Sequence, residues 1–553
     1  MAQQQRAHSQ APTKGLYVSA MSDAIPAEYT PWCQNVRFRF GEVLRAPGRS
    51  VTLETAPTTH PDMEFIDFAL HTDEKGKKTV FCMVRSRTTS WREIRYLDLA
   101  TFKFKPQIYG FTVGYDQRWS WTQGEERLFI TNGADIRAFY SDGTGTFNGQ
   151  IIGSPFCNFI EYFSNRLFAM NLANNPVGFP ATNPADPMSN KIQWSKIGDY
   201  TDWSTVAPEH GGYLELYTGS VTPITGGKVL NDRLVVYKED VITDIISTGE
   251  DNFPMRPETR VNGIGCLFPW TLQSTGQAHI FIGNDYMVYM WDGAQLHPIG
   301  QPVHSYIRRM VDTPWAPWQN APFAALYKGF KEYHLFLQST KMGHSEVLIY
   351  DYMRDTWTRD YFPRTGDVQF GGMFEIIEPG PAWTTGYDGT NYPTHYPMLL
   401  ITRGGDMFAI DERILGDRQA DPAGGMDMWW DTIDMYYSED FLVNGTCQRV
   451  ITSQKNPLNI PQDPLYYIEV IVDRGANVAA SVAVTPLTEH VGFEFADFNV
   501  TSNVRRYRFH YKPEQGAARP TWRGWSDIYV PSGDFFPTKR IVPNSVVPPI
   551  GTD

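Results

Sequence analysis

Cysteine is scarce in this sequence, and its spacing excludes two common uses of the residue. The shortest gap between neighbouring cysteines is 49 residues (33 to 82), and the five positions are Cys33, Cys82, Cys157, Cys266 and Cys447. An odd count without a Cys-x-x-Cys pair argues against a disulfide framework and against a thiolate metal or redox site. We therefore expect buried free thiols, as in a protein made in a reducing cytoplasm.

Signatures of catalysis are also missing. The 12 histidines form no His-x-His, His-Glu-x-x-His or His-x-x-x-His pair, so the usual spacing of metal ligands is absent. The sequence has no Gly-x-Ser-x-Gly nucleophile elbow and no phosphate-binding glycine loop. We expect a protein that is not an enzyme and that has no catalytic residues, no metal site and no cofactor.

Long apolar runs and an excess of positive charge are absent as well. No apolar run approaches 18 residues, and the polar start MAQQQRAHSQAPTK lacks the apolar core of a secretory signal. We therefore expect neither secretion nor direct membrane insertion. The formal net charge of −13 excludes a general nucleic-acid clamp, which needs a basic face. Two interpretations of this charge stay open: ordinary solubility, or an acidic wall that repels DNA and lets it slide past.

Aromatic and turn-forming residues are abundant instead. The 553 residues include 29 Tyr, 33 Phe, 16 Trp, 46 Gly and 39 Pro. Aromatic residues favour strands, whereas Gly and Pro mark turns. A chain of this length is too long for one compact core unless that core is built by repetition. The composition therefore predicts an all-β protein with a repeated architecture.

A rhythm of strands and turns runs from about residue 60 to residue 415. Apolar or alternating runs end in Asp-containing turns and resume with an aromatic residue, and the marker aspartates are Asp98, Asp142, Asp199, Asp244, Asp292, Asp351 and Asp411. Each stretch predicts a β-hairpin, including IQWSKIGDYTDWS with its turn at Gly198-Asp199. Units of roughly 45–60 residues with about four strands are typical of β-propeller blades. We predict six or seven blades, one of which strands from both ends of the domain could complete.

Composition also suggests where the regions of the chain begin and end. The stretch QADPAGGMD is rich in Gly, Pro and Asp, as linkers are, and longer alternating runs follow it. These longer runs predict a second all-β region, a sandwich or a barrel packed on the propeller. The predicted organisation is a mobile N-terminus (1–14), an extended lead-in (15–60), the propeller (61–415), a linker (416–429), the second β region (430–530) and a Pro-rich tail suited to docking (531–553).

Trp194 and Trp203 flank the predicted turn at Gly198-Asp199. Neighbouring blades of a propeller pack face to face, and large aromatic rings fill the space between them. We favour this packing role, in which the pair seals one blade against the next and each ring buries roughly 150–250 Å². The alternative is an exposed platform on which a sugar stacks.

Two stretches alternate basic and aromatic residues, NVRFRFGEVLRAPGR (35–49) and NVRRYRFHYK (503–512). The simpler interpretation is a strand with one wet basic face and one apolar face. The alternative is a surface that meets an acidic partner, either protein or DNA.

The first of these stretches lies in a segment that resembles the N-terminal part of bacteriophage tail components. In those proteins a short lead-in ends in a motif like Asn-Val-Arg-Phe-x-x-Gly, followed closely by Arg-x-x-Gly-Arg. The matching residues are Asn35, Val36, Arg37, Phe38, Gly41, Arg45, Gly48 and Arg49.

Three internal stretches match the same family in order. The first carries a Trp-Ser-x-x-Gly-Asp-x-x-Asp-Trp turn, which Trp194, Ser195, Gly198, Asp199, Asp202 and Trp203 fill. DRLVVYKEDVITDI resembles the next strand pair, and IFIGNDYMVYMWDG, with Trp291, Asp292 and Gly293, resembles the one after. The family is the virion propeller protein of short-tailed phages, called tail nozzle, tail hub or stabilisation protein, and the likeness covers roughly residues 15–360.

This resemblance implies a structural protein of the virion tail, assembled in the host bacterial cytoplasm. Six copies of the chain, by this resemblance, would form a ring below the portal and adaptor proteins and would contact tail fibre or spike proteins. The ring would extend the channel for double-stranded DNA without binding it specifically, retain the genome, and open for ejection. Two alternatives stay open: a receptor- or glycan-binding tail protein, and a propeller enzyme unrelated to phages.

Overall fold

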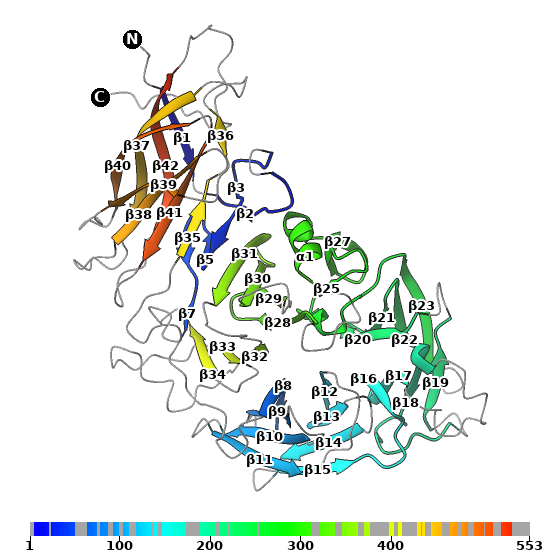
Figure 1. The fold of residues 1–553 in the computed structure, drawn as a ribbon. Coiled ribbons are helices and arrows are strands. Elements are labelled where there is room, and N and C mark those ends of the chain that lie inside the picture. Colours follow the sequence, from blue (N-terminus) through cyan, green and yellow to red (C-terminus); the bar gives the residue numbers. More distant parts are fainter. Residues whose placement is uncertain are drawn as a thin grey trace.

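The computed structural model consists of a ring of blades and a sandwich beside it, at the end of the molecule where both chain termini lie (Figure 1). The structure describes residues 5–10, 12–21, 24–49, 63–73, 78–86, 92–98, 103–109, 118–131, 133, 136–141, 146–172, 188–205, 210–217, 222–250, 254–311, 321–337, 345–362, 370–375, 398–402, 407–411, 428–432, 434–436, 444–455, 465–472, 478–484, 491–502, 504–512 and 521–532.

Seven antiparallel sheets follow one another around the ring within these residues, so the predicted β-propeller is confirmed, with seven blades. Blade one contains β8 (Met63–Thr72), β9 (Lys78–Ser86), β10 (Arg92–Asp98) and β11 (Lys103–Tyr109). Blade two contains β12 (Ser120–Gly124), β13 (Arg127–Thr131), β14 (Ile136–Ser141) and β15 (Thr146–Gln150). Blade three contains β16 (Cys157–Phe163), β17 (Arg166–Leu172), β18 (Lys191–Trp194) and β19 (Gly212–Glu215).

Blades four to seven continue the same pattern. They contain β20 (Ile224–Leu230), β21 (Arg233–Lys238), β22 (Val241–Ser247) and β23 (Met255–Asn262); β24 (Gln273–Ser274), β25 (His279–Ile282), β26 (Val288–Trp291) and β27 (Leu296–Pro298); β28 (Phe323–Tyr327), β29 (Glu332–Phe336), β30 (Ser345–Asp351) and β31 (Thr356–Phe362); β32 (Phe370–Glu375), β33 (Met398–Thr402), β34 (Met407–Asp411) and β7 (Gly48–Arg49). The short helix η1 (Met188–Asn190) precedes β18 within blade three, whereas η2 (Pro269–Thr271), η3 (Gln301–Val303) and α1 (His304–Met310) connect consecutive blades.

The ring closes with a strand from the beginning of the chain. Strand β7 pairs antiparallel with β34 and forms the outermost strand of blade seven. The innermost strands β32 and β8 lie side by side, so blades seven and one are neighbours. Blade seven is therefore the blade that is completed by strands from both ends of the domain.

Each blade is covered on both faces by its neighbours, which explains the apolar runs in its strands. Strand β21, for example, is buried at five of its six positions, whereas the outermost strand of the same blade, β23, has one buried position of eight. Strands buried on both faces lose the alternation of apolar and polar residues. The core consists of a series of apolar clusters, each between two blades.

The second all-β region is a sandwich of two sheets, which is one of the two architectures, sandwich or barrel, that the sequence predicted. One sheet has the order β40-β37-β42-β6-β5, and the other has the order β39-β38-β41-β35-β4. Strands β1 and β36 pair with β42 and β41. The strands are β1 (Gln5–Gln10), β4 (Cys33–Gln34), β5 (Val36–Arg39), β6 (Glu42–Arg45), β35 (Met428–Asp431), β36 (Met435–Tyr436), β37 (Asn444–Lys455), β38 (Leu465–Val472), β39 (Val478–Val484), β40 (Val491–Ser502), β41 (Val504–Lys512) and β42 (Thr521–Ser532).

Residues 15–49, which we call the N-terminal strap, belong to both domains. Strands β2 (Gly15–Leu16) and β3 (Tyr29–Thr30) extend blade six, while β4, β5 and β6 complete the two sheets of the sandwich. One apolar cluster, which contains Phe38, Trp357 and Phe509, runs from the propeller through the strap into the sandwich. The two domains are therefore joined by a continuous core.

Several expectations about the organisation of the chain differ from the structure. Residues 5–10, expected to be mobile, form β1 in the sandwich, because β42 offers them a long unpaired edge. The predicted linker (416–429) and tail (531–553) lie mostly outside the described residues, and their described parts belong to β35 and β42. The predicted hairpin at Gly198-Asp199 is wrong: β18 pairs with β19, and Trp203 lies on neither strand. The residues after Asp411, which would form the second strand of the last predicted hairpin, lie outside the described residues, and β34 itself pairs with β33 and β7.

All five cysteines lie in the described part of the chain, buried and without disulfide bonds, as the sequence predicted. Burial raises the pKa of the thiols of Cys157 and Cys266 to about 12, so both remain protonated at neutral pH. No helix in the described ranges is long and apolar enough to span a membrane.

Candidate functional site

A cluster of buried charged residues lies where the N-terminal strap meets blade six. Because side chains two residues apart on a strand point the same way, Arg37 and Arg39 both face this blade. Arg37 Nε donates to Glu332 Oε1 at 2.8 Å, and Arg39 Nη2 donates to the same oxygen at 2.7 Å. The Arg37 guanidinium also forms a bidentate pair with Asp360, at 2.8 and 2.9 Å. A single carboxylate thus holds two strap arginines.

Glu332 is completely buried and carries its charge there. His334 Nε2 lies 2.9 Å from its second oxygen, Oε2. Burial by itself would raise the pKa of Glu332, but the charges of Arg37, His334 and Arg39 and the hydrogen bond with His334 hold that pKa well below its usual value. The carboxylate is therefore ionised at every pH at which the protein would normally be handled.

The other strap residues that the sequence singled out connect the strap to the propeller or shape its turns. Asn35 has a left-handed backbone (φ 52°), its N–H donates to Arg359 O, and its side-chain oxygen accepts the N–H of Tyr361. Phe38 lies in the shared core, and Gly41 (φ 73°) follows Phe40 (φ 56°) in the β5–β6 turn. Gly48 pairs with Asp411 in blade seven.

The interpretation of a wet basic face is therefore wrong for both basic stretches. Arg37 and Arg39 meet acidic residues of their own chain, not those of an external partner. In the second stretch, Arg505 Nε donates to Asp527 Oδ2 at 2.6 Å across the sandwich core, and both side chains are fully buried. Arg508 pairs with Asp431 at 2.7 Å. The acidic residues that these arginines contact belong to the same chain, whereas the alternative from the sequence was an external protein or DNA.

Trp194 and Trp203 seal opposite faces of blade three, with exposed fractions of 3% and 2%. Trp194 belongs to the apolar cluster between blades three and four, together with Ile224 and Val236. Trp203 belongs to the cluster between blades two and three, which includes Phe129. This is the packing role that the sequence favoured, and burial leaves no exposed platform for a sugar at either ring.

The turn between the two tryptophans is held by its own polar side chains. Ser195 Oγ accepts the N–H of Leu167, and Asp199 Oδ1 accepts the N–H and the hydroxyl of Thr201. Asp202 accepts the N–H of Ser204 at 3.0 Å and also contacts His210. Gly198 has a left-handed backbone (φ 67°), which suits glycine. These contacts account for the residues of this motif through local structure.

The third motif has a similar structural explanation in blade five. Trp291 is buried against blade four, in the cluster that contains Val235 and Tyr237. Asp292 Oδ1 accepts the N–H groups of Ala294 and Gln295 at 2.7 and 2.6 Å, and Gly293 (φ 93°) closes the β26–β27 turn.

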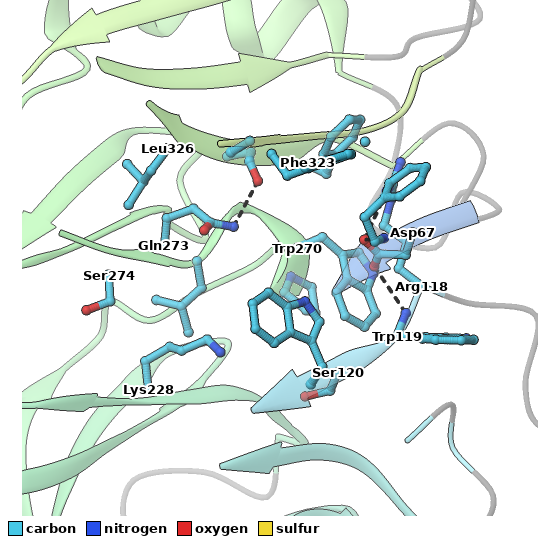
Figure 2. Close-up of a pocket in the computed structure, with 18 of the residues that line it drawn as sticks. Asp67, Arg118, Trp119, Ser120, Lys228, Trp270, Gln273, Ser274, Phe323 and Leu326 are labelled. Atoms are coloured by element: carbon cyan, nitrogen blue, oxygen red, sulfur yellow. Dashed lines mark hydrogen bonds and ion pairs between the residues drawn. The ribbon is translucent and has the colours of Figure 1, made fainter. Parts of the chain in front are cut away.

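The innermost strands of all seven blades surround a central cavity of about 440 Å³ (Figure 2). Trp121 from blade two and Trp270 from η2 line it and are half-buried. Trp270 contacts Phe159 of blade three (ring centroids 5.7 Å apart) and also packs against the apolar cluster between blades six and seven. Trp270 therefore spans from one side of the ring to the other.

The charged groups at the cavity wall come in pairs. Lys228 Nζ lies 3.1 Å from Glu161 Oε2, and Arg118 lies 3.9 Å from Asp67, across from Lys228 in Figure 2. Arg118 also stacks on Phe323, with 3.8 Å between its guanidinium carbon and the ring centroid. Burial raises the pKa of Asp67 to about 6, against the lowering effect of Arg118 and two backbone N–H donors.

The carboxylates of the wall are engaged by cations, by backbone N–H groups or by a hydroxyl, that of Thr122, which donates to Glu161 at 3.2 Å. Among the described residues, no three His, Cys, Asp or Glu side chains gather closely enough to hold a metal ion. Sequence reasoning missed the cavity residues, because they are distributed over all seven blades and η2 and meet only in the folded ring.

Comparisons with known proteins address the fold. No family model and no curated protein matches the chain. Among solved structures it is similar to the Pan2 WD40 domain of Neurospora crassa (TM-score 0.37, 8% identity, 67% of this chain and 95% of that chain). It is also similar to a prolyl endopeptidase (TM-score 0.31, 13% identity, 67% of this chain and 53% of that chain). At these identities the likeness concerns the propeller fold alone.

Proposed function

We propose that this chain is a structural protein of the tail of a short-tailed bacteriophage, a nozzle or hub. Copies of it, six by the resemblance, would form a ring below the portal and adaptor proteins and carry fibres or spikes. The ring would continue the channel for DNA, retain the packaged genome and open at ejection. The chain would assemble in the cytoplasm of the host and act in the virion tail, without catalytic activity.

The observation that carries this proposal is that the residues of the tail-like motifs hold the domains and the blades together. The strap residues Arg37 and Arg39 fasten the propeller to the sandwich through buried charges, and Trp194, Trp203 and Trp291 fill the spaces between blades. Buried, well-packed joints transmit strain instead of yielding to it. A two-domain body of this kind suits a ring segment that bears the pressure of packaged DNA.

The path of the DNA would lie between copies of the chain. The central cavity of about 440 Å³ has the size of a small-molecule site, which is too small for a duplex, and Trp270 spans it. The formal net charge of −13 supports a channel wall that repels phosphate, so that DNA moves past without binding. A closed ring needs head-to-tail contacts between identical copies.

Immunogold electron microscopy of purified phage particles, with antibody raised against this chain, tests the proposal. We expect gold confined to the distal end of the tail. Gold on lateral fibres or spikes would favour a receptor-binding tail protein instead. Absence of gold from particles with accessible tails would overturn the tail assignment and favour a propeller protein unrelated to phages.

A further inference from the structure

The central cavity of the propeller is lined by aromatic side chains and has a volume that a small molecule can fill. At about 440 Å³ it falls within the range of roughly 300–1,000 Å³ that ligand pockets occupy. Trp121 and Trp270 line it and are only half-buried, in contrast to Trp194, Trp203 and Trp291 between the blades. Half-buried rings that face a cavity offer flat apolar surface for a ligand to cover.

The charges around this cavity argue against an ionic ligand. Lys228 is paired with Glu161, and Asp67 is balanced by Arg118 and by the N–H groups of Phe68 and Trp119. Glu375, the remaining carboxylate of the wall, accepts the N–H groups of Lys328 and Gly329. An ion that entered would lose its hydration and meet charged groups that already have partners. Lys328, the other lysine of the wall, is exposed, so water and salt screen its charge.

A neutral ligand with several hydroxyl groups would meet suitable partners. An ammonium group has three donors and a carboxylate about four acceptor positions, so the Lys228–Glu161 pair retains capacity for further hydrogen bonds. The side chain of Lys228 is one-third exposed (33%), and it lies near the Trp121 ring, with 6.0 Å between Nζ and the ring centroid. Gln273 and Ser274 line the same side of the cavity as Lys228 (Figure 2).

We propose that the central cavity binds a neutral saccharide of one or two rings. The apolar face of the sugar stacks on Trp121 and Trp270, and its hydroxyl groups bond to Lys228 and to the polar side chains of Gln273 and Ser274. The cavity belongs to the propeller whatever the chain does in the virion, so this proposal stands independently of the tail function.

Saturation-transfer NMR on the full-length chain tests the proposal directly. The probes are glucose, galactose, N-acetylglucosamine, maltose and lactose at millimolar concentration, with glucuronic and galacturonic acid as anionic counterparts of the first two. We expect transfer to the ring protons of at least one neutral sugar and weaker transfer to the acids. If no neutral sugar receives saturation, or if an acid binds as well as its neutral counterpart, the proposal is overturned.

Variants place the binding in the cavity. Trp121→Ala and Trp270→Ala should each weaken binding roughly tenfold, because each removes a stacking surface. Lys228→Gln, which keeps a hydrogen-bond donor beside Glu161, should weaken it less. The matched control is Tyr217→Ala, which truncates an exposed aromatic (67%) of blade three outside the cavity and should leave binding unchanged. A melting temperature is recorded for each variant, and binding that survives in both folded tryptophan variants would overturn the assignment.

Discussion

Glu332 is the residue on which the attachment of the strap depends most. It is fully buried and accepts hydrogen bonds from both strap arginines, Arg37 and Arg39. We predict that Glu332→Gln lowers the free energy of unfolding by about 3–5 kcal/mol, because it removes the buried carboxylate that Arg37 and Arg39 share. Asp360 alone would then balance Arg37, and Asp351, 3.6 Å away, would balance Arg39. Urea denaturation at neutral pH, followed by tryptophan fluorescence, measures the loss.

The matched control is an ion pair with similar bond lengths at the surface. Arg449 and Asp497 form a bidentate pair whose side chains are 40% and 60% exposed. Water and salt screen such a pair, so Asp497→Asn should leave the denaturation midpoint unchanged within error. Equal effects of the two substitutions would contradict a special role of burial at Glu332.

Asp67 makes the stability of the propeller depend on pH. Burial raises its pKa to about 6, above the value near 3.8 expected in the unfolded chain, so the folded state binds the proton more tightly. The stability from this group is fully present below about pH 4 and is lost as the pH rises through 6. We predict that wild type gains stability relative to Asp67→Asn as the pH falls from 7 to 4, in urea titrations at each pH. A difference that stays constant with pH would contradict the raised pKa.

At the scale of elements, the contact between blades seven and one needs glycine. A Cβ on Gly372 of β32 would lie 2.4 Å from the Phe68 ring, and one on Gly371 would lie 2.9 Å from the Phe65 carbonyl. We predict that Gly372→Ala costs about 1–3 kcal/mol, because the side chains must move to accept the added methyl group. Gly149 of β15 is the control, since a Cβ there meets nothing within 4 Å. If Gly149→Ala destabilises the chain as much as Gly372→Ala does, the cost comes from replacing any glycine and not from the contact of the new methyl group with Phe68.

The sequence predicted the elements whose partners are close along the chain. The hairpins β10–β11, β21–β22, β26–β27 and β30–β31 were all visible, because each strand pairs across a short turn with its own turn residues. The pairing of β18 with β19 was missed, because Asp199 and Asp202 form local turns that resemble a hairpin. The alternation of apolar and polar residues, together with turn residues, therefore predicts only the pairing of strands that are close in sequence.

The partners of the strap could not be predicted for the opposite reason. Arg37 and Glu332 are 295 residues apart in sequence, and only the closed ring brings them together. For Arg37 and Arg39 the sequence favoured a wet basic face and left an external acidic partner as the alternative, so it did not point to Glu332. The same holds for the cavity, where Trp121 and Trp270 face one space from different blades.

At the scale of the whole molecule, the strap ties two domains into one body. It supplies the last strand of blade seven, extends blade six, and completes both sheets of the sandwich. We predict that the strap stays bound after the chain is cut at a protease site inserted between residues 50 and 62. Val36, Phe38 and Val43, each at most 2% exposed, together with the Glu332 ion pairs, hold it without the covalent link.

Size-exclusion chromatography of the cut protein in native buffer measures this. The fragment should elute with the remainder of the chain, and the same cut in an Arg37→Met/Arg39→Met variant should release it, because the buried carboxylates of Glu332 and Asp360 would then lose their arginine partners. Separation of the strap from the cut wild-type protein would show that covalent continuity, and not the buried interface, keeps the domains together. Retention in the arginine variant would assign the attachment to the apolar contacts alone.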